Sequence, residues 1–160
     1  MRQVALDAGD HPPTISPADV LRPVGWALGT TDVGINSYER APGAPFGFDD
    51  HRHLDQEEVF YVRAGTVTFL TEAGDVEVGP GELVRFAPGE FQPGRKDGPD
   101  RVVAVAIGAP AETTEIEYRR SCPPCDVETV QSLTVDREAT VVTIACTACG
   151  SMVDRIGYGG

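Results

Sequence analysis

The sequence predicts an all-β protein, in which short strands form a barrel or sandwich and a small cysteine-containing tail follows. Short runs of β-branched and aromatic residues alternate with turn signals. The 18 glycines and 13 prolines are spread along the chain, and no stretch has the length and apolar period of an ordinary helix. A chain of 160 residues suffices for one well-buried domain and an appendage. We therefore divide it into an N-terminal arm (1–24), a barrel (25–118) and a tail (119–160).

The N-terminal arm is expected to be irregular, with one short helix. Ser16 can cap a helix that begins at Pro17 and runs to Leu21. Pro23 is then expected to stop it. Beyond the arm, the pattern predicts extended segments, in chain order, at residues 34–40, 59–62, 66–71, 76–78, 83–86 and 101–107. The last segment is an almost continuous apolar run, which favours a strand buried on both faces.

The charge balance is strongly acidic. The 25 acidic side chains outnumber the 13 basic ones, giving a formal charge of −12, and Lys96 is the one lysine. Such a composition is similar to that of halophilic proteins, which are adapted to molar salt; an ordinary acidic cytosolic protein is the alternative. An acidic surface repels phosphate backbones at low salt, and at 1 M salt screening limits steering to about 3 Å. The composition therefore disfavours nucleic acid as a partner.

The N-terminal region does not resemble a targeting signal. Asp7, Asp10 and His11 interrupt its few apolar residues, so there is no apolar core of a signal peptide. No run approaches the roughly 20 apolar residues of a membrane span. We therefore expect a cytoplasmic protein with no membrane partner. In that reducing compartment, its four cysteines should be free thiols or metal ligands rather than disulfides.

Two histidines and a carboxylate are candidates for a metal site in the barrel. His51 and His53 occupy positions i and i+2, which share one face of an extended strand. Glu58 follows across a turn and opens the apolar run at 59–62. Two imidazoles and a carboxylate suit a divalent transition metal with open coordination positions. The alternative is that all three are exposed polar residues of an acidic loop. We favour the metal, because two of the chain's three histidines lie together beside this carboxylate.

Strand parity predicts which side chains surround this site. If Glu58 faces inward, Phe60 and Val62 do so as well, whereas Tyr61 and Arg63 face outward. Two aromatic residues, Phe48 and Phe86, either line the mouth of the site or belong to the core. Two acids, Asp49 and Asp50, either accept hydrogen bonds from the histidine rings or are simply solvated.

Around these residues the sequence resembles the two signature motifs of the cupin superfamily. The first motif contains His51, His53, Glu58 and Gly65, with Pro45 where the family has a leading glycine. The second begins at Gly81 and ends at Gln92. Over residues 25–108 the resemblance implies a cupin-type double-stranded β-helix, or jelly-roll barrel, and a homodimer. It also implies a divalent metal in the barrel, which in this family is iron, manganese, nickel, copper or zinc.

Gln92 is the main departure from the second motif, because the family usually has a histidine ligand at this position; Ala87 likewise replaces a proline. An amide oxygen is a weaker donor than imidazole, but it can complete the coordination sphere of a hard or borderline ion. The alternative is that Gln92 only forms hydrogen bonds inside the barrel, which leaves three ligands. Both ligand sets are compatible with Fe(II) or Mn(II).

The tail contains two C-x-x-C units separated by twenty residues: Cys122, Cys125, Cys146 and Cys149. Four thiolates at this spacing suit one tetrahedral zinc ion. With strands expected at 127–135 and 140–145, the tail resembles a zinc-ribbon hairpin, although Asp126 stands where such knuckles commonly have glycine. A redox centre is the alternative, but it requires a βαβ context that the pattern lacks. Zinc would supply folding energy that so small a core lacks. The acidic charge of the tail favours packing on the barrel or on another protein over binding to nucleic acid.

Two classes of function remain. The first is a metal-dependent enzyme of dioxygenase, isomerase or lyase type that acts on a small polar molecule. The second is a non-catalytic module that binds a small-molecule ligand or senses it, with the ribbon used for protein interaction; a purely structural adaptor belongs to the same class. No acid or base partner is evident, and the facing of Tyr38 and Glu39 cannot be fixed. The enzyme is slightly favoured, and the fold alone does not decide between the classes.

Overall fold

The computed structural model confirms an almost entirely β structure. It describes residues 1–6, 18–41, 46, 50–71, 73–95, 99–113, 115–136, 138–139 and 141–157. These ranges contain the short helix α1 (Val24–Leu28) and the following strands: β1 (Val20–Arg22), β2 (Gly34–Arg40), β3 (His51–His53), β4 (Glu57–Ala64), β5 (Val67–Thr71), β6 (Gly74–Val78), β7 (Leu83–Phe86), β8 (Gly94–Arg95), β9 (Val102–Ala109), β10 (Ile116–Cys122), β11 (Val127–Asp136), β12 (Val141–Cys146) and β13 (Met152–Gly157).

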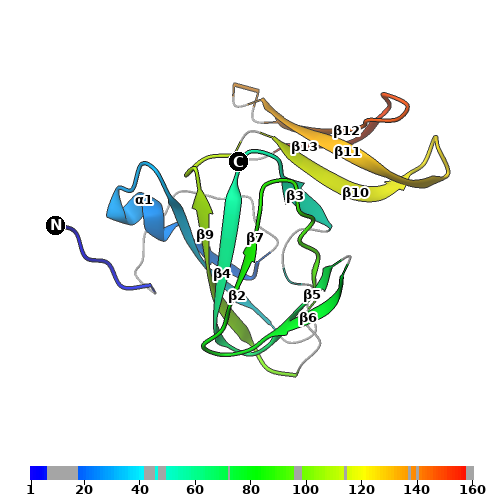
Figure 1. Ribbon diagram of the computed structural model, residues 1–160. Coiled ribbons are helices and arrows are strands. Elements are labelled where there is room, and N and C mark those ends of the chain that lie inside the picture. The colour runs from blue at the N-terminus through cyan, green and yellow to red at the C-terminus, as the bar shows by residue number, and fades with distance from the viewer. Residues whose placement is uncertain are drawn as a thin grey trace.

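The barrel is formed by two antiparallel sheets that pack on one another (Figure 1). One sheet has the strand order β1-β2-β9-β4-β7, and the other has the order β6-β5-β8. The strands predicted at 34–40 and 83–86 have the predicted bounds. This double-sheet arrangement is the jelly roll that the sequence motifs imply.

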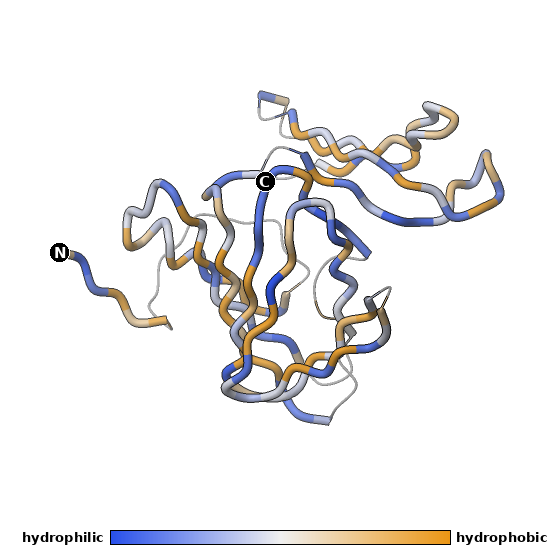
Figure 2. The backbone as a smooth tube through the Cα atoms, viewed as in Figure 1, coloured by the Kyte–Doolittle hydropathy of each residue, from blue (hydrophilic) through white to orange (hydrophobic). Residues whose placement is uncertain are grey.

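Aromatic side chains from both sheets form the core of the barrel. Phe46, Phe60, Phe69 and Phe86 pack with ring centroids 5.1–6.2 Å apart, a spacing favourable for aromatic pairs. Of the two interpretations of Phe86, the structure supports the one that places it in the core. The hydrophobic stretches of the barrel strands are orange in Figure 2.

The parity predicted for β4 is confirmed. Phe60 and Val62 are buried, whereas Tyr61 and Arg63 are exposed. Strand alternation thus places Glu58, which is buried, on the inner face of the barrel.

The prediction that residues 101–107 are buried on both faces is wrong. In β9, Val102, Ala104 and Ala106 are fully buried, whereas Ile107 is 37% exposed. The strand lies between β2 and β4 with one face on the core and the other directed outward. The apolar run is continuous because the outward positions, Val103, Val105 and Ile107, also carry apolar residues, and these are only half-buried or exposed.

The prediction of a short helix ending at Leu21 is also wrong for those of its residues that the structure describes. Leu21 lies in β1, which pairs with β2, and Ser16 and Pro17 lie outside the described residues. Helix α1 begins immediately after Pro23, which occupies the N-cap position. The proline therefore precedes a helix rather than ending one, since a proline at the start of a helix loses no intrahelical hydrogen bond.

The tail forms a sheet that extends into the barrel. Its strand order is β13-β12-β11-β10-β3, so that β10 pairs with β11 on one side and with β3 on the other (Figure 1). The predicted strands at 127–135 and 140–145 correspond to β11 and β12. Strand β10 is mostly hydrophilic (Figure 2) and crosses the predicted boundary between residues 118 and 119. The tail and β3, the strand that carries the two candidate histidine ligands, are therefore parts of one hydrogen-bonded sheet.

Gly65, which closes the first motif, is required by the turn after β4. Its φ is +72°, and a Cβ added there would lie 2.6 Å from the carbonyl oxygen of Arg101. We expect Gly65→Ala to lower the free energy of unfolding by about 1–2 kcal/mol through the left-handed conformation alone. The loss should be larger in practice, because a backbone carbonyl must also move. Urea denaturation measures it. Gly79→Ala is the control, since a Cβ there meets ordinary contact at 3.5 Å; equal midpoints for the two variants would contradict the prediction.

Candidate metal centres and the barrel cavity

Strand β3 directs His51 and His53 to the same side. The strand is hydrogen-bonded along both edges: its residues pair with β10, while its carbonyls at His53 and His51 accept from the backbone N–H groups of Gly89 (2.8 Å) and Gln92 (2.9 Å). The two imidazole rings lie edge to face with centroids 5.2 Å apart. The ring of His51 also stacks on Tyr118 of β10, at 5.9 Å. Both neighbours of β3 thus fix the orientation of its side chains.

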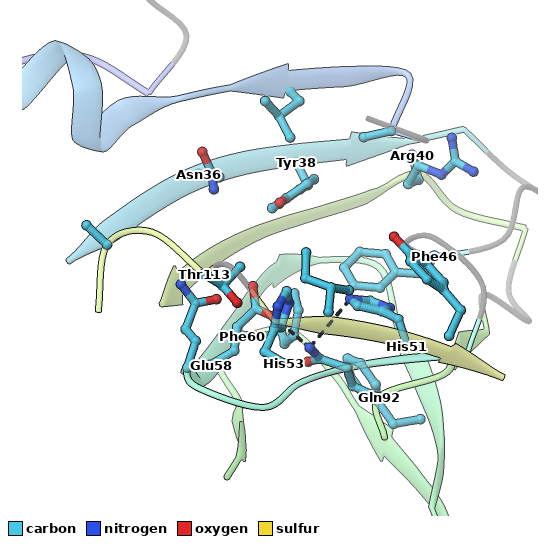
Figure 3. Close-up of a pocket in the computed structure, with 17 residues that line it drawn as sticks. Asn36, Tyr38, Arg40, Phe46, His51, His53, Glu58, Phe60, Gln92 and Thr113 are labelled. Atoms are coloured by element: carbon cyan, nitrogen blue, oxygen red, sulfur yellow. Dashed lines mark hydrogen bonds and ion pairs between the residues drawn. The ribbon is translucent and has the colours of Figure 1, made fainter. Parts of the chain in front are cut away.

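Glu58 on β4 completes a cluster of three candidate ligands. Its Oε2 lies 3.4 Å from Nε2 of His53, and one ligand atom from each of His51, His53 and Glu58 lies within 4.8 Å of the others (Figure 3). Two donors bound at ordinary metal distances on one ion are about 3.0–3.4 Å apart, so this spacing fits a metal. The Nδ1 atom of His53 is buried and has no hydrogen-bond partner. The structure therefore brings together the three residues that the sequence singled out.

Gln92 reaches the same cluster, but with its amide nitrogen. Nε2 of Gln92 donates to Oε2 of Glu58 at 2.9 Å and lies 3.5 Å from Nε2 of His51. Its Oε1 is buried without a hydrogen-bond partner, an arrangement that costs about 1–3 kcal/mol. When no metal is bound to the carboxylate of Glu58, the Gln92 amide favours the orientation in which its NH₂ group faces that carboxylate. A cation at the cluster would favour the oxygen instead, and a half-turn of the amide group exchanges the two ends.

Gln92 is thus predicted to contribute to metal affinity. Gln92→His should tighten binding, because imidazole is the better donor for borderline ions, and Gln92→Leu should weaken it several-fold. Competition with a chelator measures both. Gln56→Leu is a matched control, because Gln56 is another buried glutamine of this cavity whose amide donates to the carbonyl of Pro110. Equal affinity for wild type and Gln92→Leu would show that Gln92 only packs.

The cluster faces a cavity of about 250 Å³ whose opposite wall is β2 (Figure 3). Asn36, Tyr38 and Arg40 alternate along this strand and line the cavity. Burial and the charge of Glu58 raise the pKa of Tyr38, so its phenol stays protonated at neutral pH. Sequence reasoning assigned no role to these residues, because the facing of an isolated strand depends on a register that only its neighbours reveal.

Glu39 and Asp50 each form ion pairs with arginines. Glu39 points outward and pairs with Arg22 and Arg101. Oδ2 of Asp50 lies 3.3 Å from a guanidinium nitrogen of Arg119. Phe48 and Asp49 lie outside the described residues.

The four cysteines of the tail also converge. The Sγ atoms of Cys122 and Cys149 are 3.7 Å apart and those of Cys125 and Cys146 are 4.0 Å apart, distances at which no disulfide is formed. Zinc–thiolate bonds arranged as a tetrahedron place sulfur atoms about 3.8 Å apart. The cluster therefore fits one zinc ion.

The turns after the two C-x-x-C units explain the departure at Asp126. Asp126 and Gly150 hold equivalent positions, and both have positive φ, at 57° and 72°. Each donates its N–H to the carbonyl of the first cysteine of its unit, at 2.9 Å. Aspartate is among the few residues that tolerate this conformation, which is why it can replace the usual glycine. The hydroxyl of Thr129, followed by backbone N–H groups, lowers the pKa of Cys146, whereas burial raises the pKa of Cys122 and hydrogen bonds with neighbouring thiols raise the pKa of Cys125.

Comparison with known proteins identifies the barrel. The family model described as "Cupin domain" matches residues 37–108, which include all four barrel candidates. Residues 37–108 are a cupin domain. Comparison with curated protein sequences gives no match. Among the described residues, no helix is long and apolar enough to cross a membrane.

Solved structures share the cupin fold at low sequence identity. A cupin-superfamily sugar phosphate isomerase from Silicibacter pomeroyi is 17% identical, with a TM-score of 0.64 over 84% of this chain and 82% of that one. A putative sugar phosphate isomerase from Acidithiobacillus ferrooxidans is 21% identical, with a TM-score of 0.53 over 86% and 74%. The polyketide cyclase RemF from Streptomyces resistomycificus is 22% identical, with a TM-score of 0.58 over 72% and 83%. At these identities the similarity establishes the fold and leaves the substrate open.

Proposed function

We propose that this cupin protein is a metal-dependent enzyme that transforms a small polar molecule by isomerase, lyase or dioxygenase chemistry. One observation carries the proposal: His51, His53 and Glu58 converge within 4.8 Å on the wall of an internal cavity. A metal held only for stability would be enclosed by ligands, whereas three protein ligands beside a cavity leave coordination positions open. The cavity of about 250 Å³ is slightly below the range typical of drug-sized ligands, which favours a small substrate.

The ligand set favours iron, manganese, nickel or zinc, with Gln92 as a fourth ligand. A divalent ion at this position would polarise a substrate oxygen or bind O₂. We further propose that the second metal of the chain is a structural zinc held by Cys122, Cys125, Cys146 and Cys149.

The residues around the cluster have roles that support catalysis. Phe46, Phe60 and Phe69 line the cavity and exclude water, which strengthens electrostatic interactions inside it. The phenol of Tyr38 faces the cavity in its protonated form and can donate a hydrogen bond to a substrate oxygen on which negative charge develops. The stacking of Tyr118 on His51 holds that ring in place.

The test is a measurement of metal content on the protein as purified, followed by turnover assays on small diols, thiols and enediols. We expect two metals per chain, of which one is zinc in the tail, and turnover that a chelator removes and the barrel metal restores. Oxygen uptake with turnover would assign a dioxygenase, and turnover without it an isomerase or lyase. Stoichiometric ligand binding without turnover would overturn the enzyme and favour the binding or sensory module.

A further inference from the structure

A row of directly opposed residues crosses the tail sheet from a candidate barrel ligand to a cysteine of the zinc cluster. His51 of β3 pairs with Tyr118 of β10, and Tyr118 pairs with Gln131 of β11 (Figure 1). Gln131 in turn pairs with Cys146 of β12. Residues that lie directly opposite each other in antiparallel strands direct their side chains to the same face of the sheet. The row therefore connects the two candidate metal centres through two intervening side chains.

The side chains of this row are closely packed. Tyr118, Gln131 and Cys146 are each at most 5% exposed. The amide of Gln131 donates to two backbone carbonyls of β10, each at 3.3 Å, and the ring of His51 stacks on Tyr118. Close-packed interiors transmit strain, so a displacement of Cys146 alters the support of His51.

Strand β10 is also part of the cavity wall. Ile116 and Tyr118 line the cavity, and they pair with His53 and His51 respectively. Strand β3 has only three residues and depends on β10 for one of its two hydrogen-bonded edges. A change in the tail that shifts β10 therefore affects the orientation of both histidines and the shape of the cavity.

The zinc cluster has a thiolate that an oxidant in solution can reach. Cys149 is exposed, whereas Cys122, whose Sγ lies 3.7 Å from that of Cys149, is buried. A cysteine that binds zinc is a thiolate, which is also the nucleophilic form. The S–S bond of a disulfide is about 2.0 Å long. Its formation would draw these two sulfur atoms out of the tetrahedral spacing that zinc requires.

We propose that the tail is a redox switch, in which oxidation of Cys149 and Cys122 by a hydroperoxide releases zinc and weakens the barrel metal site. The thiolate of Cys149 attacks one peroxide oxygen, which gives a sulfenic acid and one hydroxide ion. The thiolate of Cys122 then attacks that sulfur and displaces a second hydroxide. Two thiolates thus lose two electrons in forming the disulfide, and the peroxide is reduced.

Zinc then keeps two of its four thiolate ligands, those of Cys125 and Cys146, and dissociates. Cys146 loses the ion that anchors its end of the row, and His51 loses the firm support of Tyr118. The two states of the switch are the zinc-bound tail and the oxidised, zinc-free tail. This inference rests on the proposed function, since it requires both metals.

The test uses the protein with zinc in the tail and Mn(II) in the barrel, treated with hydrogen peroxide. Disulfide formation is followed by mass spectrometry, the released zinc is measured and removed by gel filtration, and Mn(II) is then titrated by electron paramagnetic resonance. We expect loss of the tail zinc and Mn(II) binding weakened about 10-fold, the lower end of the range for losing a group that orients a metal ligand. Dithiothreitol followed by one equivalent of zinc should restore the affinity.

Tyr118→Leu separates the oxidation from its transmission to the barrel. This variant keeps all four cysteines, so peroxide should still release its zinc. Its Mn(II) affinity should already be lower before treatment and should change about 2-fold or less on treatment, because the contact that carries the effect is absent. Met152→Leu is the control for oxidation elsewhere in the tail, since Met152 is exposed and oxidisable. It should respond as the wild type does.

An unchanged Mn(II) affinity after peroxide has released zinc from the wild type would overturn the inference. So would retention of zinc under peroxide, or an equally large loss of Mn(II) affinity in Tyr118→Leu. A wild type that binds no zinc in the tail or no Mn(II) in the barrel before treatment would overturn the proposed function, and this inference with it. The measurements before and after peroxide therefore distinguish the two failures.

Discussion

Replacing His51 and His53 together with alanine is expected to remove the barrel metal without unfolding the protein. Both imidazoles lie on the cavity side of β3, and neither belongs to the aromatic core built around Phe60 and Phe69. The loss of affinity should exceed the 10- to 100-fold that follows removal of an outer partner of a metal ligand. Elemental analysis should therefore show the metal content falling by one per chain, while the ribbon zinc is retained.

Arg52→Ala provides the control for this double variant. Arg52 lies between the two histidines, but its guanidinium pairs with Glu117 and stacks on Phe91. It should leave the metal content unchanged. An unchanged metal content in the double histidine variant would exclude these residues as ligands, and unfolding of the double variant by circular dichroism would show that the site is part of the structural core.

The second large effect is expected from Cys146→Ser, which should release the zinc of the tail. Structural zinc contributes about 10–16 kcal/mol of apparent binding free energy in small zinc-binding peptides, far more than the small core around Val142 and Ile144 can replace. Strands β11, β12 and β13 should therefore lose their protection from hydrogen exchange. The barrel core should stay folded, because none of its buried cluster comes from the tail.

The connection through β10 extends this effect to the barrel metal. When the tail unfolds, β3 loses its pairing with β10, and His51 loses its stacking on Tyr118. We expect weaker binding of the barrel metal in Cys146→Ser, measured by chelator competition. Zinc added back after chelation should restore the affinity for the barrel metal in the wild type but not in the variant. Absence of zinc from wild type, together with four freely reactive thiols, would contradict the ribbon; unchanged affinity of the barrel metal would show that β10 does not support the site.

The barrel strands could be predicted from sequence where the residue pattern is compatible with only one kind of secondary structure. The strands at 34–40 and 83–86 were located because β-branched and aromatic runs end at clear turn signals. The candidate ligands His51, His53 and Glu58 could be found because parity on a strand and the spacing of the motif agree. The structure brings them together, and whether they bind metal stays a prediction.

The elements that sequence reasoning missed are those whose stability comes from their neighbours. Strand β10 carries Glu117, Arg119 and Arg120, which give no apolar alternation; it is a strand because β3 and β11 both supply hydrogen-bonding edges. Tyr38 and Arg40 were missed for a related reason, since their facing is set by the pairing of β2 with β9. Pairings between residues far apart in sequence carry little local signal.

The long-range pairing of β3 also has a consequence for the order of biosynthesis. His51 pairs with Tyr118, which follows it by more than sixty residues in the chain, and the cysteines follow later still. While the chain emerges from the ribosome, the barrel strands can fold first, since domains form as units in the order of synthesis. Strand β3 then still lacks one of its two hydrogen-bonded edges. We expect a nascent chain to acquire its barrel metal only after the tail has emerged, bound zinc and paired β10 with β3, so that supply of one metal controls maturation of the site for the other.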